Sequence, residues 1–174
     1  MKKTTALTLL LLTLALTGFA QTSSDRYVEP AGGFSIRPPA GWRLEAREGN
    51  KFKLAFGPAS TVFVANLNFR DDVSAIALKE YVDATIDNIL KNYASVGATS
   101  TKLVSRTEFV TDSKERGEKT VYLTEFRGMR INTSQYIFNA GPKKLLATFT
   151  ALESEKAANE NLFADAIRTL QLDH

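Results

Sequence analysis

The chain contains no cysteine and a single histidine, His174, at its last position. Without cysteine there can be no disulfide, thiol nucleophile or cysteine-linked lipid, so packing alone must hold the fold. A lone histidine where chain ends fray argues against serine–histidine catalysis and histidine zinc sites. The sequence also lacks a glycine-rich phosphate loop and a Gly-x-Ser-x-Gly elbow. Among common enzyme chemistries, hydrolysis by two carboxylates stays open.

A strong excess of charge is also missing. The chain has 22 lysines and arginines against 19 acidic residues, a formal net charge of +3. Loss of Lys2 and Lys3 with a signal peptide would leave about +1. A near-neutral chain argues against nucleic acid as a partner, so aromatic residues at strand spacing, such as Tyr122 and Tyr136, are assigned to the core.

The first residues have the pattern of a secretory signal peptide. Lys2 and Lys3 precede an apolar run over residues 6–15, and Gly18 and Ala20 are small residues where a signal peptidase reads. The run is shorter than the ~20 residues that span a bilayer. We therefore expect cleavage after Ala20, no stable membrane insertion of the mature chain, and a periplasmic or secreted protein.

The most regular pattern predicts an amphipathic helix between Ser74 and Tyr93, with Asp72 or Ser74 as its cap and Gly97 beyond its end. Its large apolar residues recur three or four positions apart. They are Leu78, Tyr81, Val82, Ile86, Ile89, Leu90 and Tyr93. A second stripe, with Phe163 and Ile167, predicts a C-terminal helix. Both apolar stripes must be buried against another layer.

The segments on both sides of the long helix alternate apolar and polar residues, as half-buried strands do. The expected strands cover residues 34–37, 42–47, 51–56, 61–69, 103–110, 120–126, 131–139 and 145–152. Short turns between neighbours indicate antiparallel pairing, and a charged loop is expected over residues 112–119. The order predicts an α+β fold in which four strands precede the long helix. Its antiparallel sheet should have about six to eight strands.

A short motif opens this sheet. It consists of Phe34, Ile36, Pro39, Gly41 and Trp42. The motif, placed after a signal peptide, resembles the PsbP-like superfamily, and the order of elements extends the similarity over roughly residues 27–172. The resemblance implies an α-β-α sandwich and a non-enzymatic accessory or binding role, and it assigns no functional residue.

We expect three parts: a signal peptide over residues 1–20, a flexible tether over 21–31 and a single domain over 32–172. The domain is expected to be a non-enzymatic binding or accessory protein of the cell envelope that contacts an envelope protein. Two alternatives stay open. One is a metal-dependent or carboxylate hydrolase, and the other is a carrier of a small apolar ligand with a cavity between sheet and helix.

Asp71 and Asp72 are the candidate metal ligands. They are adjacent acids at the expected junction of strand and helix, where calcium or another hard divalent cation could bind. A simpler explanation is that they cap the helix and interact with its dipole. No resident cofactor is expected otherwise.

Four cations are the candidate partner-binding residues: Arg127, Arg130, Lys143 and Lys144. The two arginines precede the strand expected over residues 131–139, and the two lysines follow it. A strand of that length places them ~25 Å apart, so the sequence predicts two small patches and no continuous groove. Edge protection and solubility would also account for such cations.

Overall fold

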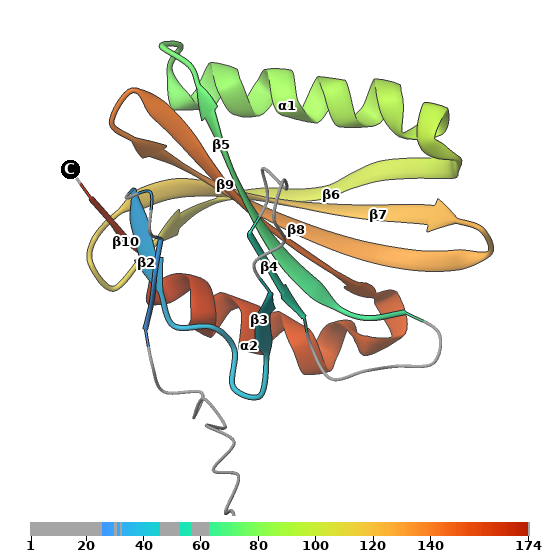
Figure 1. Ribbon diagram of the computed structural model, residues 1–174. Coiled ribbons are helices and arrows are strands. Elements are labelled where there is room, and N and C mark those ends of the chain that lie inside the picture. Colours follow the sequence, from blue (N-terminus) through green and yellow to red (C-terminus); the bar gives the residue numbers. More distant parts are fainter. Residues whose placement is uncertain (1–25, 30, 32, 46–52, 57–62, 174) are drawn as a thin grey trace, which may run out of the picture.

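The computed structural model describes residues 26–29, 31, 33–45, 53–56 and 63–173. The expected signal peptide lies outside the described residues. Within the described part of the chain, no helix has both the length and the apolar character that crossing a bilayer requires. The described residues form ten strands and two α-helices, arranged as a layered α+β structure (Figure 1).

A seven-stranded antiparallel sheet is the central layer, with strand order β3-β4-β5-β9-β8-β7-β6. Its strands are β3 (Arg43–Glu45), β4 (Lys53–Phe56), β5 (Asn66–Val73), β6 (Ala98–Val110), β7 (Arg116–Phe126), β8 (Met129–Ala140) and β9 (Lys143–Leu152). Every neighbouring pair is antiparallel. The sheet type and size predicted from the alternating pattern are therefore confirmed.

A smaller antiparallel sheet joins the two ends of the domain, in the order β1-β2-β10. Its strands are β1 (Tyr27–Val28), β2 (Phe34–Ile36) and β10 (Gln171–Leu172). The sequence predicts a flexible tether over residues 21–31, but β1 lies within that range and pairs with β2. The folded domain thus begins before residue 32. The sequence did not predict this start, because a strand of two residues is too short to leave a periodic signal.

One helix covers each face of the large sheet, as the α-β-α prediction requires (Figure 1). Helix α1 (Leu78–Asn92) follows β5, and helix α2 (Lys156–Arg168) follows β9. Short 3-10 turns flank them, η1 (Tyr93–Val96) after α1 and η2 (Glu153–Glu155) before α2. The prediction that Asp72 or Ser74 caps α1 is wrong, since the N-cap is Ala77 and no side chain caps the helix.

The two faces of the sheet belong to separate apolar clusters, because neighbouring strand residues point to opposite sides. On β8, Tyr136 and Phe138 pack in the cluster that contains Phe163 and Ile167 of α2. Ile137, between them in sequence, packs in the cluster that contains Val82, Ile86 and Ile89 of α1. Leu67 and Phe69 of β5 also face α2.

Candidate functional site

The sequence-predicted acids and lysines meet at one end of the large sheet. Antiparallel pairing of β5 with β9 places Asp72 opposite Lys144 and Val73 opposite Lys143. The Lys143 ammonium contacts the Asp71 carboxylate, Nζ to Oδ2, at 2.6 Å, and about half of each side chain is exposed. The two candidate metal ligands and the two candidate partner-binding lysines therefore lie side by side.

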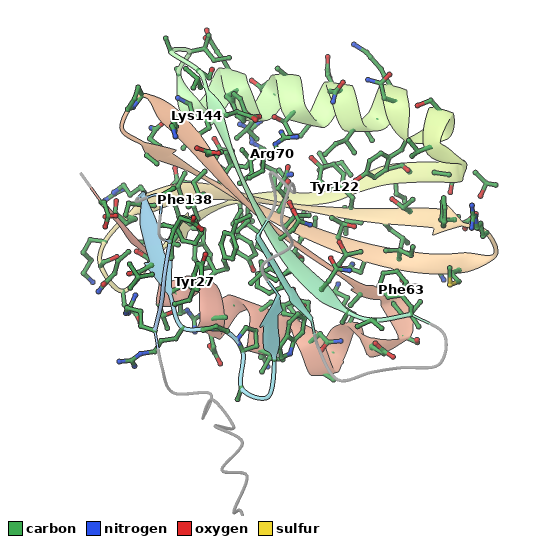
Figure 2. The ribbon with its side chains drawn as sticks, viewed as in Figure 1. Tyr27, Phe63, Arg70, Tyr122, Phe138 and Lys144 are labelled. Atoms are coloured by element: carbon green, nitrogen blue, oxygen red, sulfur yellow. The ribbon has the colours of Figure 1, made fainter. Side chains whose placement is uncertain are left out.

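Asp72 and Lys144 lie on the α1 side of this end. The Asp72 carboxylate accepts hydrogen bonds from Arg70 Nη2 at 2.8 Å and from the Tyr81 hydroxyl of α1. Lys144 is only 4% exposed, and its Nζ donates to the Ser74 carbonyl at 3.0 Å. Figure 2 labels Arg70 and Lys144 in this region. These contacts tie the start of α1 to the sheet.

The structure does not bring Asp71 and Asp72 together as ligands of one ion. Neighbouring residues of a strand point to opposite faces, and each of these carboxylates already has a cationic partner. Over the described ranges, no group of three or more histidine, cysteine, aspartate or glutamate side chains could hold a metal.

Beside this ion pair lies a pocket of about 270 Å³. Its lining includes Glu29, Phe34, Phe69, Asp71, Lys143 and Leu145. Phe34 and Phe69 are buried and stacked, with ring centroids 4.6 Å apart and an interplanar angle of 29°. The pocket thus combines buried apolar walls with an exposed ion pair.

Glu29 is the buried charge of this pocket, with 8% of its surface exposed. Its carboxylate accepts a hydrogen bond from the Tyr27 hydroxyl at 2.6 Å and one from the Ala31 amide at 3.4 Å. Burial first, and then Glu29, raise the pKa of Tyr27 above its ordinary value. The hydroxyl therefore stays protonated and holds the carboxylate in place.

Two exposed apolar side chains lie close to the pocket in the chain. Val73, the last residue of β5, is 82% exposed and pairs with Lys143, which lines the pocket, and Ile76 on the β5–α1 connection is 45% exposed. The backbone amide of Ser74 donates to the Pro142 carbonyl at 3.2 Å, which fixes this connection to the β8–β9 turn. We call the pocket together with Val73 and Ile76 the pocket end of the molecule.

The two arginine candidates lie at the opposite end of β8, next to the β7–β8 turn. The Arg127 guanidinium lies 5.0 Å from the centroid of the Phe126 ring. Arg130 forms an ion pair with Glu153, Nε to Oε2, at 3.0 Å. A more open groove of about 740 Å³ runs past Arg130 and Leu152. The arginines and the lysines therefore do not share a surface.

Sequence reasoning missed the residues that form the wall of the pocket. Glu29 lies in the range assigned to the tether, and Phe34 was expected only as a strand residue. Two residues of high strand propensity, Tyr27 and Val28, ahead of Gly33 are the one local signal of the short strand. The packing of β2 against β5 is a tertiary contact, which a local sequence pattern cannot predict.

No protein-family model matches the chain, and no curated protein sequence matches it significantly. Solved structures do match. The solution structure of the cyanobacterial PsbP protein CyanoP from Synechocystis has a TM-score of 0.64 at 14% identity, covering 90% of this chain and 96% of its own. The Ran-binding protein Mog1p of Saccharomyces cerevisiae has a TM-score of 0.59 at 8% identity, covering 85% and 94%.

LpqN of Mycobacterium tuberculosis, described as involved in cell envelope biogenesis, is also similar. Its TM-score is 0.58 at 8% identity, and the match covers 86% of this chain and 90% of LpqN. At these identities the likeness concerns the fold, and it extends over nearly the whole of each protein. The chain therefore has the PsbP/Mog1-like fold that its opening motif and order of elements predict.

Proposed function

We propose that this protein is an exported, non-enzymatic binding or accessory protein of the cell envelope that contacts a partner protein through the pocket end. The observation that carries the proposal is the pocket with apolar walls and an ion pair at its edge, together with Val73, which is 82% exposed. Protein interfaces concentrate their binding energy in a few apolar or aromatic anchors that fill such pockets, inside a polar rim. Asp71 and Lys143 would supply that rim.

The chemistry of the pocket favours binding over catalysis. Its described lining residues include no serine, cysteine or histidine. The Asp71 carboxylate is paired with Lys143, and the Glu29 carboxylate accepts from Tyr27 and Ala31. Both acids are therefore held by donors inside the protein, where a hydrolytic pair would have to face a substrate and a water molecule.

The structural relatives support the same class. Mog1p is a Ran-binding protein, and LpqN is described as involved in cell envelope biogenesis. The signal-peptide pattern of residues 1–20 adds the argument for export. Fold alone does not decide function, so the pocket end is the specific basis of the proposal.

The test is affinity capture from an envelope extract with purified protein. The double substitution Val73→Glu/Ile76→Glu places two charges on the pocket end at exposed positions, so the fold should survive. The matched control is Val96→Glu/Val104→Glu, which changes exposed valines on η1 and β6. We expect one discrete partner to be captured by the wild type and the control and lost with the pocket-end variant.

Two results would contradict the proposal: no reproducible partner with the wild type, or a partner that both variants retain equally. Fractionation of cells that express the full chain tests the export part. We expect a protein shortened by about 20 residues outside the cytoplasm, the length of a typical signal peptide. The metal alternative predicts a rise in Tm with calcium, zinc or manganese, and we expect none.

A further inference from the structure

We infer that the pocket is the seat of one aromatic side chain of the partner, an indole or phenol ring that packs against Phe34 and Phe69. This inference rests on the proposed function, and it names the chemistry that the pocket end recognises. It follows from the walls, the size and the polar groups of the pocket, taken in turn.

The walls are aromatic on one side. Phe34 of β2 and Phe69 of β5 come from different sheets, and both line the pocket. Tyr27 of β1 extends the row, with its ring centroid 6.1 Å from that of Phe34. A further ring placed against such a row gains edge-to-face or offset-stacked contacts beyond its buried area.

The volume suits one ring system. An engineered apolar cavity of about 150 Å³ in another protein accommodates benzene. At about 270 Å³, this pocket has room for an indole or a phenol and not for a folded segment of chain. Leu145 and Ala140 complete its apolar lining.

The polar groups favour an aromatic ring over an aliphatic side chain. Lys143 also lines the pocket, and a cation near a ring face is attracted by the quadrupole of the ring. Arg70 lines the pocket too, but its guanidinium is paired with Asp72 on the α1 side of the sheet. The half-exposed Asp71 carboxylate is an acceptor for an indole N–H or a phenol O–H, and a leucine side chain has no such donor. Tryptophan and tyrosine both carry such a polar edge, and they are also enriched among interface anchors.

The probes are N-acetyl-tryptophanamide, N-acetyl-tyrosinamide and, as the aliphatic comparison, N-acetyl-leucinamide. Each is titrated into 15N-labelled protein, purified after expression of the full chain, and followed through its amide chemical shifts. We expect saturable shifts at Gly33, Phe34 and Leu145 with both aromatic probes. The leucine probe should bind at least tenfold more weakly.

Ala31→Trp is the blocking variant, because Ala31 lines the pocket and is exposed, so that its new ring can fill the site from within. Ala157→Trp is the matched control in the groove at the other end. We expect the aromatic shifts to vanish in the first variant and to persist in the second. Equal binding of the leucine probe, or shifts that survive Ala31→Trp, would overturn the inference.

The capture experiment separates this inference from the proposed function. Loss of the partner with Val73→Glu/Ile76→Glu but not with Ala31→Trp would leave the binding function in place and refute the aromatic anchor. Loss with both variants supports both. Saturable aromatic binding with no captured partner would contradict the proposed function and leave the pocket's preference for a ring in place.

Discussion

The two faces of the seven-stranded sheet are each covered by one helix, but they are packed by different means. The α2 face is aromatic. Phe163 of α2 stacks on Phe149 with ring centroids 3.9 Å apart, and Trp42 meets Phe163 edge to face at 5.2 Å. The α1 face is smaller and mainly aliphatic. There Val82 and Ile86 pack in one cluster with Ile137, Leu146 and Tyr122.

The two faces differ more clearly in their buried polar atoms. In the described chain, four buried side-chain atoms make no direct hydrogen bond of normal geometry in the protein: Arg70 Nε, Thr120 Oγ1, Tyr122 Oη and Gln135 Oε1. Burial raises the pKa of Tyr122, and the neighbouring Thr120 hydroxyl offsets part of that rise. Thr120 lies opposite Gln135 and two residues before Tyr122, which packs under α1. All four therefore belong to the α1 side of the sheet. Each such atom costs about 1–3 kcal/mol, so this face is the weaker of the two.

Ion pairs at the surface offset part of this cost on the α1 side. The Arg106 guanidinium of β6 donates to Asp83 of α1 and to Glu118 of β7, so it joins the middle of the helix to the sheet. Tyr81 and Asp72 do the same near the helix start. The comparison indicates that α2 and its aromatic cluster carry the stability of the domain, while α1 can open at a lower free energy.

The largest expected effect comes from Phe163→Ala. Removal of a buried aromatic ring lowers the free energy of unfolding by about 3–5 kcal/mol. Truncation of a buried isoleucine costs about 2–5 kcal/mol, and in the smaller α1 cluster we expect a value near ~2 kcal/mol. Urea unfolding of Phe163→Ala and Ile86→Ala, with equal m-values, provides the measurement. A cost for Ile86→Ala equal to that for Phe163→Ala would refute the difference between the faces.

Arg106→Met should have the next largest effect, about 1–2 kcal/mol. It removes charge-assisted hydrogen bonds and leaves the mostly buried Glu118 without its cation. Native-state hydrogen exchange should then show faster exchange of α1 amides, with those of α2 unchanged. Arg168→Met is the control, because its pair with Asp165 is well exposed and should contribute little. Equal acceleration in both helices would mean that they open together.

Tyr122→Phe should change the stability of the domain by less than about 0.5 kcal/mol, because it keeps the ring and deletes a buried hydroxyl whose contact with Thr120 falls short of a normal hydrogen bond. The matched variant Tyr27→Phe removes a hydroxyl that donates to Glu29, and it should destabilise the domain by about 0.5–1 kcal/mol. Thermal unfolding should show the larger loss of Tm for Tyr27→Phe. An equal or larger loss for Tyr122→Phe would contradict the weak pairing of its hydroxyl.

The smallest effect concerns alkaline pH. Burial is the main cause that raises the pKa values of Tyr81, Tyr93 and Tyr122, all on the α1 side. Their unfolded values lie near 10, so their contribution is fully present below that pH and is lost as the pH rises toward the folded values. We expect protection of α1 amides to fall above about pH 10, and less so in Tyr122→Phe. A loss that begins below pH 9 would require another titrating group.

Helix α1 could be predicted from the sequence because a long apolar stripe is a local property. The start of β7 could not. Residues 112–119 have the charge pattern of a loop, yet Arg116 to Lys119 are strand residues, because Glu118 pairs with Arg106 on the edge strand. Gly117 marks a second contact, with β8 on the other side of β7, since a Cβ there would lie 2.5 Å from the Phe138 ring.

The candidate site was predictable only in pieces. Asp71 and Lys143 were each singled out, but their contact joins residues 72 positions apart and depends on the register of β5 with β9. Register follows from which faces are buried across the whole sheet, so a single strand cannot reveal it. The pocket additionally needs the small sheet, whose strands are too short to leave a periodic signal.

The small sheet joins segments from the two ends of the described chain, and the pocket needs both of them. Strand β2 is completed by β10, with Phe34 opposite Leu172, and the backbone amide of Gly33 donates to the Asp173 carboxylate at 2.9 Å. Gly33 and Phe34 are also walls of the pocket. This wall is therefore incomplete until residues 171–173 have paired with β2. A chain cut before residue 171 is left without the completed pocket.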